Sequence, residues 1–144
     1  MKIVVLVALV SAYAATPSLA LGESSENGEC GYRASFNCAK ADDAESRIIC
    51  STPDLRAADC AMGYAYRDAR ALPGANPNEW LRKNQRRWVA SRDAACAGRS
   101  GPAQAACLKK ETEQRLRWLI GHYSLPVTGK AYESYWSAKA SDLK

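Results

Sequence analysis

The stretch NQRRWVASRDAAC, from Asn84 to Cys96, places Gln85, Trp88, Arg92 and Cys96 at successive spacings of three, four and four residues. These spacings put the four side chains on one face of an α-helix. A cysteine that forms a disulfide usually faces the interior of a small domain. We therefore expect this face to be buried, with Trp88 in the core of a stapled helical fold.

An arginine on a buried face needs a carboxylate partner, because an unpaired charge inside a protein is costly. For Arg92 the expected partner is Asp59, which lies in the preceding predicted helix. Tryptophan and arginine are also favoured as anchors in protein interfaces, so a direct binding role for the stretch is the alternative. The structural interpretation is preferred because the stretch shares its face with Cys96.

Apolar residues recur at helical spacing along most of the chain after residue 40, and no stretch alternates as a strand does. The predicted fold class is all-α, a small disulfide-stapled bundle of about four helices. Two short helices are predicted, one within residues 40–50 and one within 131–140. The first long helix is predicted from Pro53, with Thr52 as N-cap, to Pro73–Gly74, and the second from Pro77 to Cys96, with Asn76 as N-cap and Glu79 in a capping box. The third is predicted from about Ala103 to Ile120, where Gly121 stops it.

The cysteine count is even, which in a small exported chain indicates a disulfide framework. Six cysteines allow fifteen pairings, among which the sequence alone does not choose. Cys96 and Cys107 flank a loop, so their bond would staple a helical hairpin. Cys38 and Cys50 can pair only if the chain turns back before its helix, because a continuous helix would hold them about 18 Å apart. That arrangement leaves Cys30 to pair with Cys60 and tie the leader onto the helix that begins at Pro53.

The chain begins with a lysine, an apolar run and small residues, the layout of a secretory signal peptide. We expect residues 1–20 to be removed by cleavage at Ala20–Leu21, with an earlier cut after Ala14 as the alternative. The apolar run is shorter than the roughly 20 residues of a membrane span. We therefore expect an exported protein, periplasmic or secreted, with a flexible acidic leader at 21–34, a helical domain at 35–122 and a tail at 123–144.

Charge and motif content argue against several functional classes. Removal of Lys2 with residues 1–20 changes the formal charge from +5 to +4, and no basic run interleaved with aromatics suggests a nucleic-acid partner. No CxxC pair is present, and His122 is the only histidine, so neither a metal site nor a cofactor is expected. No motif joins a nucleophile to a base, and the expected protein is not an enzyme.

Four segments of the chain are similar to a known family. SFNCAKA, RIICSTPDLRAADCAMGYAYRDA, NQRRWVASRDAAC and CLKKETEQRLRWL together resemble the LprI-like lysozyme-inhibitor family, from about Ser35 to Ile120. The residues that carry the resemblance are Phe36, Cys38, Ile49, Cys50, Leu55, Asp59, Met62, Tyr66, Arg67, Gln85, Trp88, Arg92, Cys96, Cys107, Leu108 and Arg115. Within this set we interpret Asp59, Tyr66, Gln85, Trp88 and Arg92 as structural residues of the family fold.

The resemblance implies a non-catalytic helical protein whose partner is lysozyme, which it would block so that peptidoglycan is spared. Two features depart from the family pattern. Cys30 and Cys60 are additional to the four cysteines expected, and Ala58 stands where a leucine is expected before the aspartate. The tail after Gly121 lies outside the resemblance.

Animal-type lysozymes are basic, and a partner of charge +4 gains no long-range attraction from its net charge. A local acidic surface is therefore needed. The best candidates are the leader glutamates and the cluster Asp42, Asp43 and Glu45. Carboxylates near a helix start can perform acid–base chemistry, but more often they interact with the helix dipole.

The alternative function belongs to a different class. It is an envelope binding module that contacts an anionic cell-wall polymer or another envelope protein through its basic helices. The candidate residues for this contact are Arg82, Lys83, Arg86, Arg87, Lys109 and Lys110.

Overall fold

The computed structural model describes residues 30, 33–73 and 77–136 of the 144-residue chain. The predicted signal peptide and the leader glutamates lie outside these residues, as does the predicted cap Asn76. The described residues contain four α-helices, one short 3₁₀ helix and no strand, so the predicted all-α stapled bundle is confirmed. The elements are η1 (Cys38–Lys40), α1 (Ala44–Ser51), α2 (Pro53–Ala71), α3 (Pro77–Cys96) and α4 (Gly101–Tyr123).

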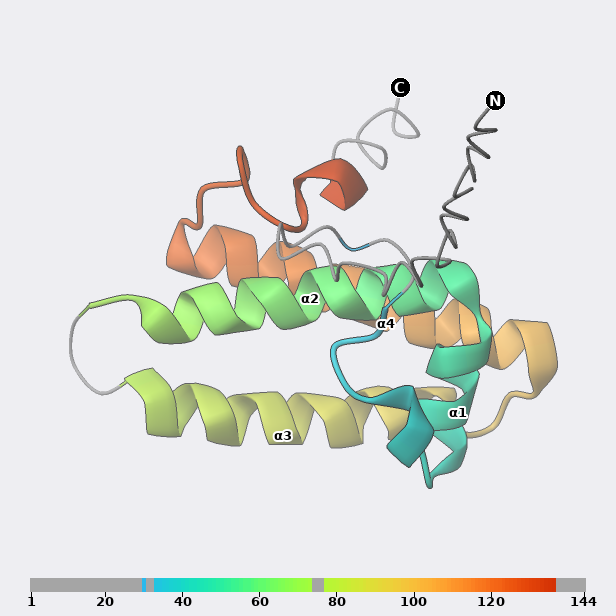
Figure 1. The fold of residues 1–144 in the computed structure, drawn as a ribbon. Coiled ribbons are helices and arrows are strands. Elements are labelled where there is room, and N and C mark those ends of the chain that lie inside the picture. Colours follow the sequence, from blue (N-terminus) through green and yellow to red (C-terminus); the bar gives the residue numbers. More distant parts are fainter. Residues whose placement is uncertain (1–29, 31–32, 74–76, 137–144) are drawn as a thin grey trace, which may run out of the picture.

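The centre of the bundle is the packing of α2 along α4 (Figure 1). Helix α3 runs antiparallel to α2 and makes most of its contacts with α4. The short helix α1 packs across one end of the bundle, where it contacts both α2 and α4. Helix α3 makes fewer contacts with α2 than with α4, which leaves room for a further segment between α2 and α3. Residues 33–37 approach this region (Figure 1).

Local sequence signals explain where the first two helices begin. Asp43 is the N-cap of α1, and Thr52 separates α1 from α2 with φ −109° and ψ 106°. An extended residue before proline is expected, because the proline ring disfavours the helical conformation there. Thr52 occupies the predicted cap position of α2 with Pro53 at the first turn, although its side chain makes no capping hydrogen bond.

Helix α4 extends past Gly121, where the sequence predicted its end. It continues to Tyr123, and Ser124 then adopts the left-handed conformation with φ 48°. The N–H of Leu125 donates to the carbonyl of Ile120 at 2.9 Å, which closes the helix end. Leu125 is buried in the core, so the hydrophobic contact after the cap determines the end of the helix.

The chain beyond α4 is part of the core. Residues 133–136 form a single helical turn, and Tyr132 just before it is fully buried. Its hydroxyl lies 3.1 Å from the carbonyl of Pro126 and 3.3 Å from Asp68 on α2. Burial, with the nearby charge of Asp68, raises the pKa of Tyr132 to about 12. The tail is therefore held by packing as well as by hydrogen bonds.

The three disulfides have the arrangement that the spacing of the cysteines favours. Cys96–Cys107 joins α3 to α4, and Cys38–Cys50 joins η1 to α1, where the chain turns back before its helix as required. Cys30–Cys60 ties the start of the described chain to α2. The three pairs have Cα–Cα separations of 5.5 to 5.7 Å, within the range of ordinary disulfides.

Replacement of Tyr132 tests whether the tail belongs to the core. Tyr132→Ala removes a fully buried ring, so we expect the free energy of unfolding to fall by about 3–5 kcal/mol. Trp80→Ala is a suitable control, since Trp80 is 52% exposed and should cost less than half as much. Urea denaturation followed by circular dichroism measures both. Equal losses for the two variants would mean that the tail does not contribute to the core.

Candidate functional site

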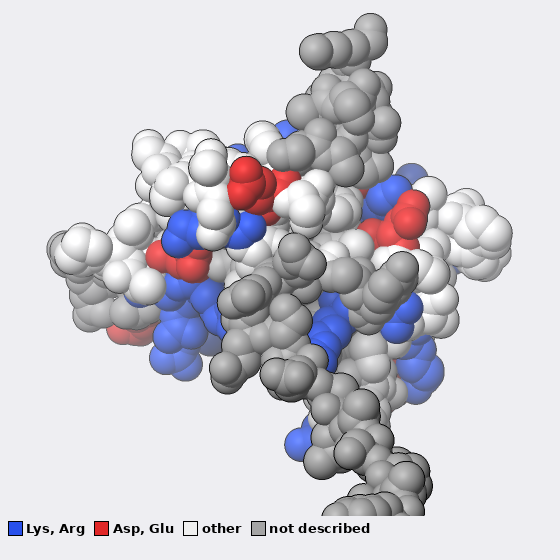
Figure 2. Space-filling model, turned by 45° about the horizontal axis from the view of Figure 1, so that its top comes forward, with Lys and Arg blue, Asp and Glu red and all other residues white. Residues whose placement is uncertain are grey.

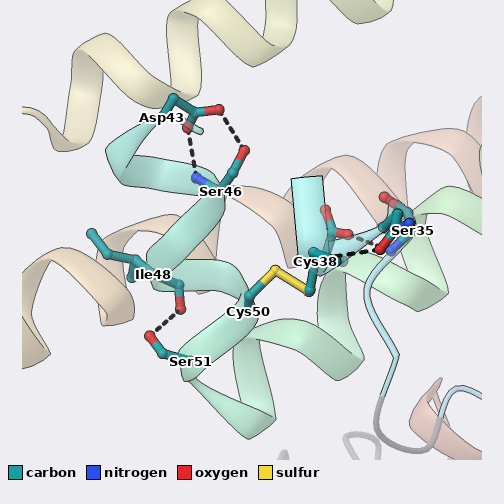
Figure 3. The surroundings of a disulfide bond; sticks show 10 residues. Ser35, Cys38, Asp43, Ser46, Ile48, Cys50 and Ser51 are labelled. Carbon is teal, nitrogen blue, oxygen red and sulfur yellow. Dashed lines mark hydrogen bonds between the residues drawn. A yellow bond between two sulfur atoms is a disulfide. The ribbon is translucent and has the colours of Figure 1, made fainter. Parts of the chain in front are cut away.

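The turn that joins η1 to α1 forms a small projection at the lower right of Figure 1. We call residues 37–50 the stapled projection. Figure 3 shows the Cys38–Cys50 disulfide that closes it. Asn37 caps η1 by accepting the N–H of Ala39 at 3.0 Å. The bond and the cap restrict the projection before any partner arrives.

The three acidic candidates lie at the start of α1 in this projection. Asp42 and Asp43 are exposed and Glu45 is half-buried. Asp43 turns toward Ser46, whose N–H and hydroxyl it accepts at 2.7 and 2.6 Å (Figure 3). The hydroxyl and then the N–H of Ser46 lower the pKa of Asp43. Asp43 is thus a structural cap, whereas the side chains of Asp42 and Glu45 make no hydrogen bond or ion pair with any described residue.

A cavity of about 650 Å³ lies beside the projection, between residues 33–36, α2 and α3. Ser46 and Ile49 of α1 line one side of it. The five residues that the sequence analysis interpreted as structural all line this cavity: Asp59, Tyr66, Gln85, Trp88 and Arg92. The pattern that resembles the family therefore converges on one open hollow.

Asp59 fixes the wall of this cavity. Its carboxylate is 2% exposed and accepts the backbone N–H of Ser35 at 2.7 Å. Burial raises the pKa of Asp59, while the hydrogen bonds from Ser35 and the charge of Arg92 act in the opposite direction. The result is a buried acid that holds the segment before η1 against α2.

The predicted ion pair between Arg92 and Asp59 is wrong. Arg92 is buried, at 6% exposure, as expected for its face of α3. Its Nε and Nη2 lie 2.8 and 2.7 Å from one oxygen of Asp93, the next residue in the chain. The guanidinium bends back along its own helix, and it acts on Asp59 through its charge without forming the ion pair.

Gln85 and Trp88 connect the cavity to α4. Gln85 donates to the sulfur of Met62 at 3.2 Å and accepts from Nε of Arg115 at 2.9 Å. Trp88 is half-buried and lies between two guanidinium groups, 5.2 Å from that of Arg92 and 5.6 Å from that of Arg115. The contacts with Arg115 give the stripe of the opening stretch a packing role against α4, whereas Met62 and Arg92 themselves line the cavity.

Sequence reasoning did not single out several residues of the cavity wall, and Ser35 and Gly63 are two of them. Ser35 and Gly63 meet where residues 33–36 cross α2, and a Cβ on Gly63 would overlap the Cβ of Ser35. An isolated glycine inside a predicted helix often marks such a close approach. Gly63 could therefore have indicated that another segment lies on this face of α2, but the identity of that segment was not readable.

The six basic candidates do not form one free surface. Lys109 pairs with Asp54 at 3.3 Å, and Lys83 pairs with Glu79 at 3.0 Å. On the face drawn in Figure 2, blue and red groups are interspersed and neither charge covers the surface continuously. The remaining candidates are exposed and form no ion pair with the described residues: Arg82, Arg86, Arg87 and Lys110.

In the part of the chain that the structure describes, no three His, Cys, Asp or Glu side chains gather as metal ligands would. None of the described helices is long and apolar enough to cross a membrane.

Replacement of Asp59 by asparagine should change how stability depends on pH. Because the folded pKa of Asp59 is raised above its ordinary value of 3.8, the folded state holds this proton more tightly. The contribution of Asp59 to the free energy of unfolding therefore falls as the pH rises from about the ordinary pKa of the carboxyl group through its folded pKa. We expect the stability of Asp59→Asn relative to the parent to increase over that window. Urea denaturation of both proteins from about pH 3 to about pH 7 measures the difference, and a flat difference would contradict the raised pKa.

No curated protein and no solved structure matches this chain. A family model described as Lysozyme inhibitor LprI does match it, over residues 38–119. The matched range begins at the first cysteine of the stapled projection and runs almost to the end of α4, more than half of the 144 residues. It contains the projection, two of the three disulfides and most of the cavity wall. The chain therefore belongs to the LprI family of lysozyme inhibitors.

Proposed function

We propose that this protein is an exported inhibitor that binds a lysozyme and prevents it from cleaving peptidoglycan, with no covalent chemistry of its own. Family membership supports the partner. The three disulfides support export, because such bonds persist in oxidising compartments. The periplasm and the medium outside the cell are the two compartments that fit.

The observation that carries this proposal is the stapled projection. A convex element suits an enzyme whose substrate cleft is concave, and its rigidity lowers the entropy lost on binding. Asp42 and Glu45 are available for contact there, and the capped Asp43 adds a third negative charge. Lys40 and Arg47 lie in the same projection, and Arg47 donates to the carbonyl of Asp42, so the three acids leave residues 37–50 with a net charge of −1. This small local excess of negative charge supports contact with a basic lysozyme, which the net charge of the chain does not. The projection would contact basic residues at the rim of the lysozyme cleft and so cover the cleft.

A charge reversal at Asp42 tests this contact. Asp42→Lys leaves the Asp43 cap in place, and we expect it to weaken inhibition by about tenfold or more, because a like charge would face the enzyme. The measurement is lysis of a cell-wall suspension by an animal-type lysozyme, titrated with the oxidised chain from residue 21 onward. Glu79→Lys is the matched control, since Glu79 is an exposed acid on α3 and the change in charge is the same. Equal effects of both variants would mean that Asp42 is not at the interface.

Removal of single disulfides separates the projection from the rest of the fold. Cys38→Ser/Cys50→Ser opens the projection and should abolish inhibition, whereas Cys30→Ser/Cys60→Ser opens a bond in the other core cluster, away from the projection, and should retain inhibition. Both variants are assayed at a temperature at which circular dichroism shows them to be folded. Inhibition that survives the first variant would contradict the role of the projection.

A second candidate function rests on the exposed arginines of α3. Arg82, Arg86 and Arg87 form no ion pair with the described residues, so they are available to an anionic cell-wall polymer. Such binding would weaken steeply with salt, because charged contacts are screened. We expect Arg86→Glu/Arg87→Glu to abolish retention on a polyanionic cell-wall fraction without affecting lysozyme inhibition. Retention that is independent of salt and of these residues would exclude this function.

A further inference from the structure

We propose that the cavity between residues 33–36, α2 and α3 is a binding site for a short peptide that carries free carboxylates. The site is distinct from the proposed contact with lysozyme. A hollow cannot enter a concave cleft, whereas it can receive a small ligand. Its volume of about 650 Å³ is in the range of known ligand sites, which hold molecules of a few residues.

The charges that line the cavity favour an anion. Three arginines line it, Arg33, Arg67 and Arg92, and among the described residues that line it Asp59 is the only carboxylate. Asp59 already accepts the Ser35 N–H. Arg92 is paired with Asp93 outside the cavity, so the surplus of positive charge comes from Arg33 and Arg67, which form no ion pair with the described residues.

Each arginine retains donors for a ligand. Arg92 uses Nε and Nη2 on Asp93, and no described residue accepts from its Nη1. The guanidinium of Arg67 lies 3.9 Å from the ring centroid of Tyr64, which orients the group without neutralising it. Arg33 is exposed and forms no ion pair with a described residue. Planar guanidinium groups bind carboxylates through paired hydrogen bonds, so the three groups suit a ligand with more than one carboxylate.

The walls favour a peptide over a small inorganic anion. Aromatic side chains cover much of the interior: Phe36, Tyr64, Tyr66 and Trp88. They can bury the body of an organic ligand, which phosphate lacks. The buried carboxylate of Asp59 would repel the concentrated charge of phosphate, whereas a peptide can hold its two carboxylates apart, at the arginines, and place backbone N–H groups near Asp59. Carboxylates at the arginines and an amide backbone against the rings match this distribution.

The test is isothermal titration calorimetry of the oxidised chain from residue 21 onward with acetyl-Ala-Glu-Ala, whose two carboxylates are free. The matched control ligand is acetyl-Ala-Gln-Ala-amide, which has the same shape and no charge. We expect one saturable site for the acidic peptide and at least about tenfold weaker binding of the amide. Inorganic phosphate at the same concentration should not displace the peptide. Absence of binding, equal binding of both peptides, or displacement by phosphate would each overturn the proposal.

Two variants place the peptide in the cavity. Arg67→Gln removes a lining cation and should weaken binding by about fivefold or more, and Arg33→Gln, on the non-helical segment, provides the same test should the first variant fail to fold. Arg82→Gln is the matched control, with the same loss of charge on the exposed face of α3 and outside the cavity. Equal weakening by Arg82→Gln would show attraction by net charge only and would overturn the site.

The outcome is distinguishable from that of lysozyme inhibition. Asp42→Lys should leave the peptide affinity unchanged, and Arg67→Gln should leave inhibition unchanged. Peptide binding by a protein that fails to inhibit any lysozyme would support the site and contradict the proposed function. Inhibition without peptide binding would do the reverse.

Discussion

The hydrogen bond from the backbone N–H of Ser35 to the buried carboxylate of Asp59 is the interaction on which the rest of the site depends. It holds a segment without regular structure against α2, and that segment supplies one wall of the cavity and leads directly into the stapled projection. The approach is possible because residue 63 is glycine, so the helix has no Cβ where Ser35 lies. A buried acid and a missing side chain together position both candidate binding surfaces.

Most of the fold was predictable because its signals are local. Helix spacing, Pro53 and Pro77 at helix starts and the even number of cysteines indicate a stapled helical bundle, and the reach of a disulfide limits the pairings. The end of α4 was not predictable in this way. Gly121 is a common helix stop, but the burial of Leu125 extends the helix to Tyr123. A contact made after the helix overrides the propensity of a residue within it.

The candidate site was predictable in its residues and not in its shape. The residues of the opening stretch were placed on a helix face with Cys96, and that placement indicated burial. The structure places Gln85 and Trp88 at a boundary, with one side packed against α4 and the other on the cavity. The partner of Arg92 was misassigned because periodicity gives the direction of a side chain from the helix axis but not the rotamer. Its guanidinium reaches Asp93 along its own helix.

The two proposed contacts use different surfaces of a small domain. The proposed lysozyme contact uses the acids at the start of α1, and the proposed peptide site uses the arginines that line the cavity. Because the two surfaces share residues 33–50 as a common support, the Cys38–Cys50 bond and the Asp59 hydrogen bond stabilise both.

The hydrogen bond between the N–H of Cys30 and the carbonyl of Ala131, at 3.3 Å, brings the first and last described stretches of the chain together. Cys30 is also covalently joined to α2, and in Figure 1 the tail lies above this helix while the stapled projection lies below it. A surface, carrier or fused domain attached near either residue would therefore lie on the opposite side of α2 from the stapled projection, which stays accessible to a partner.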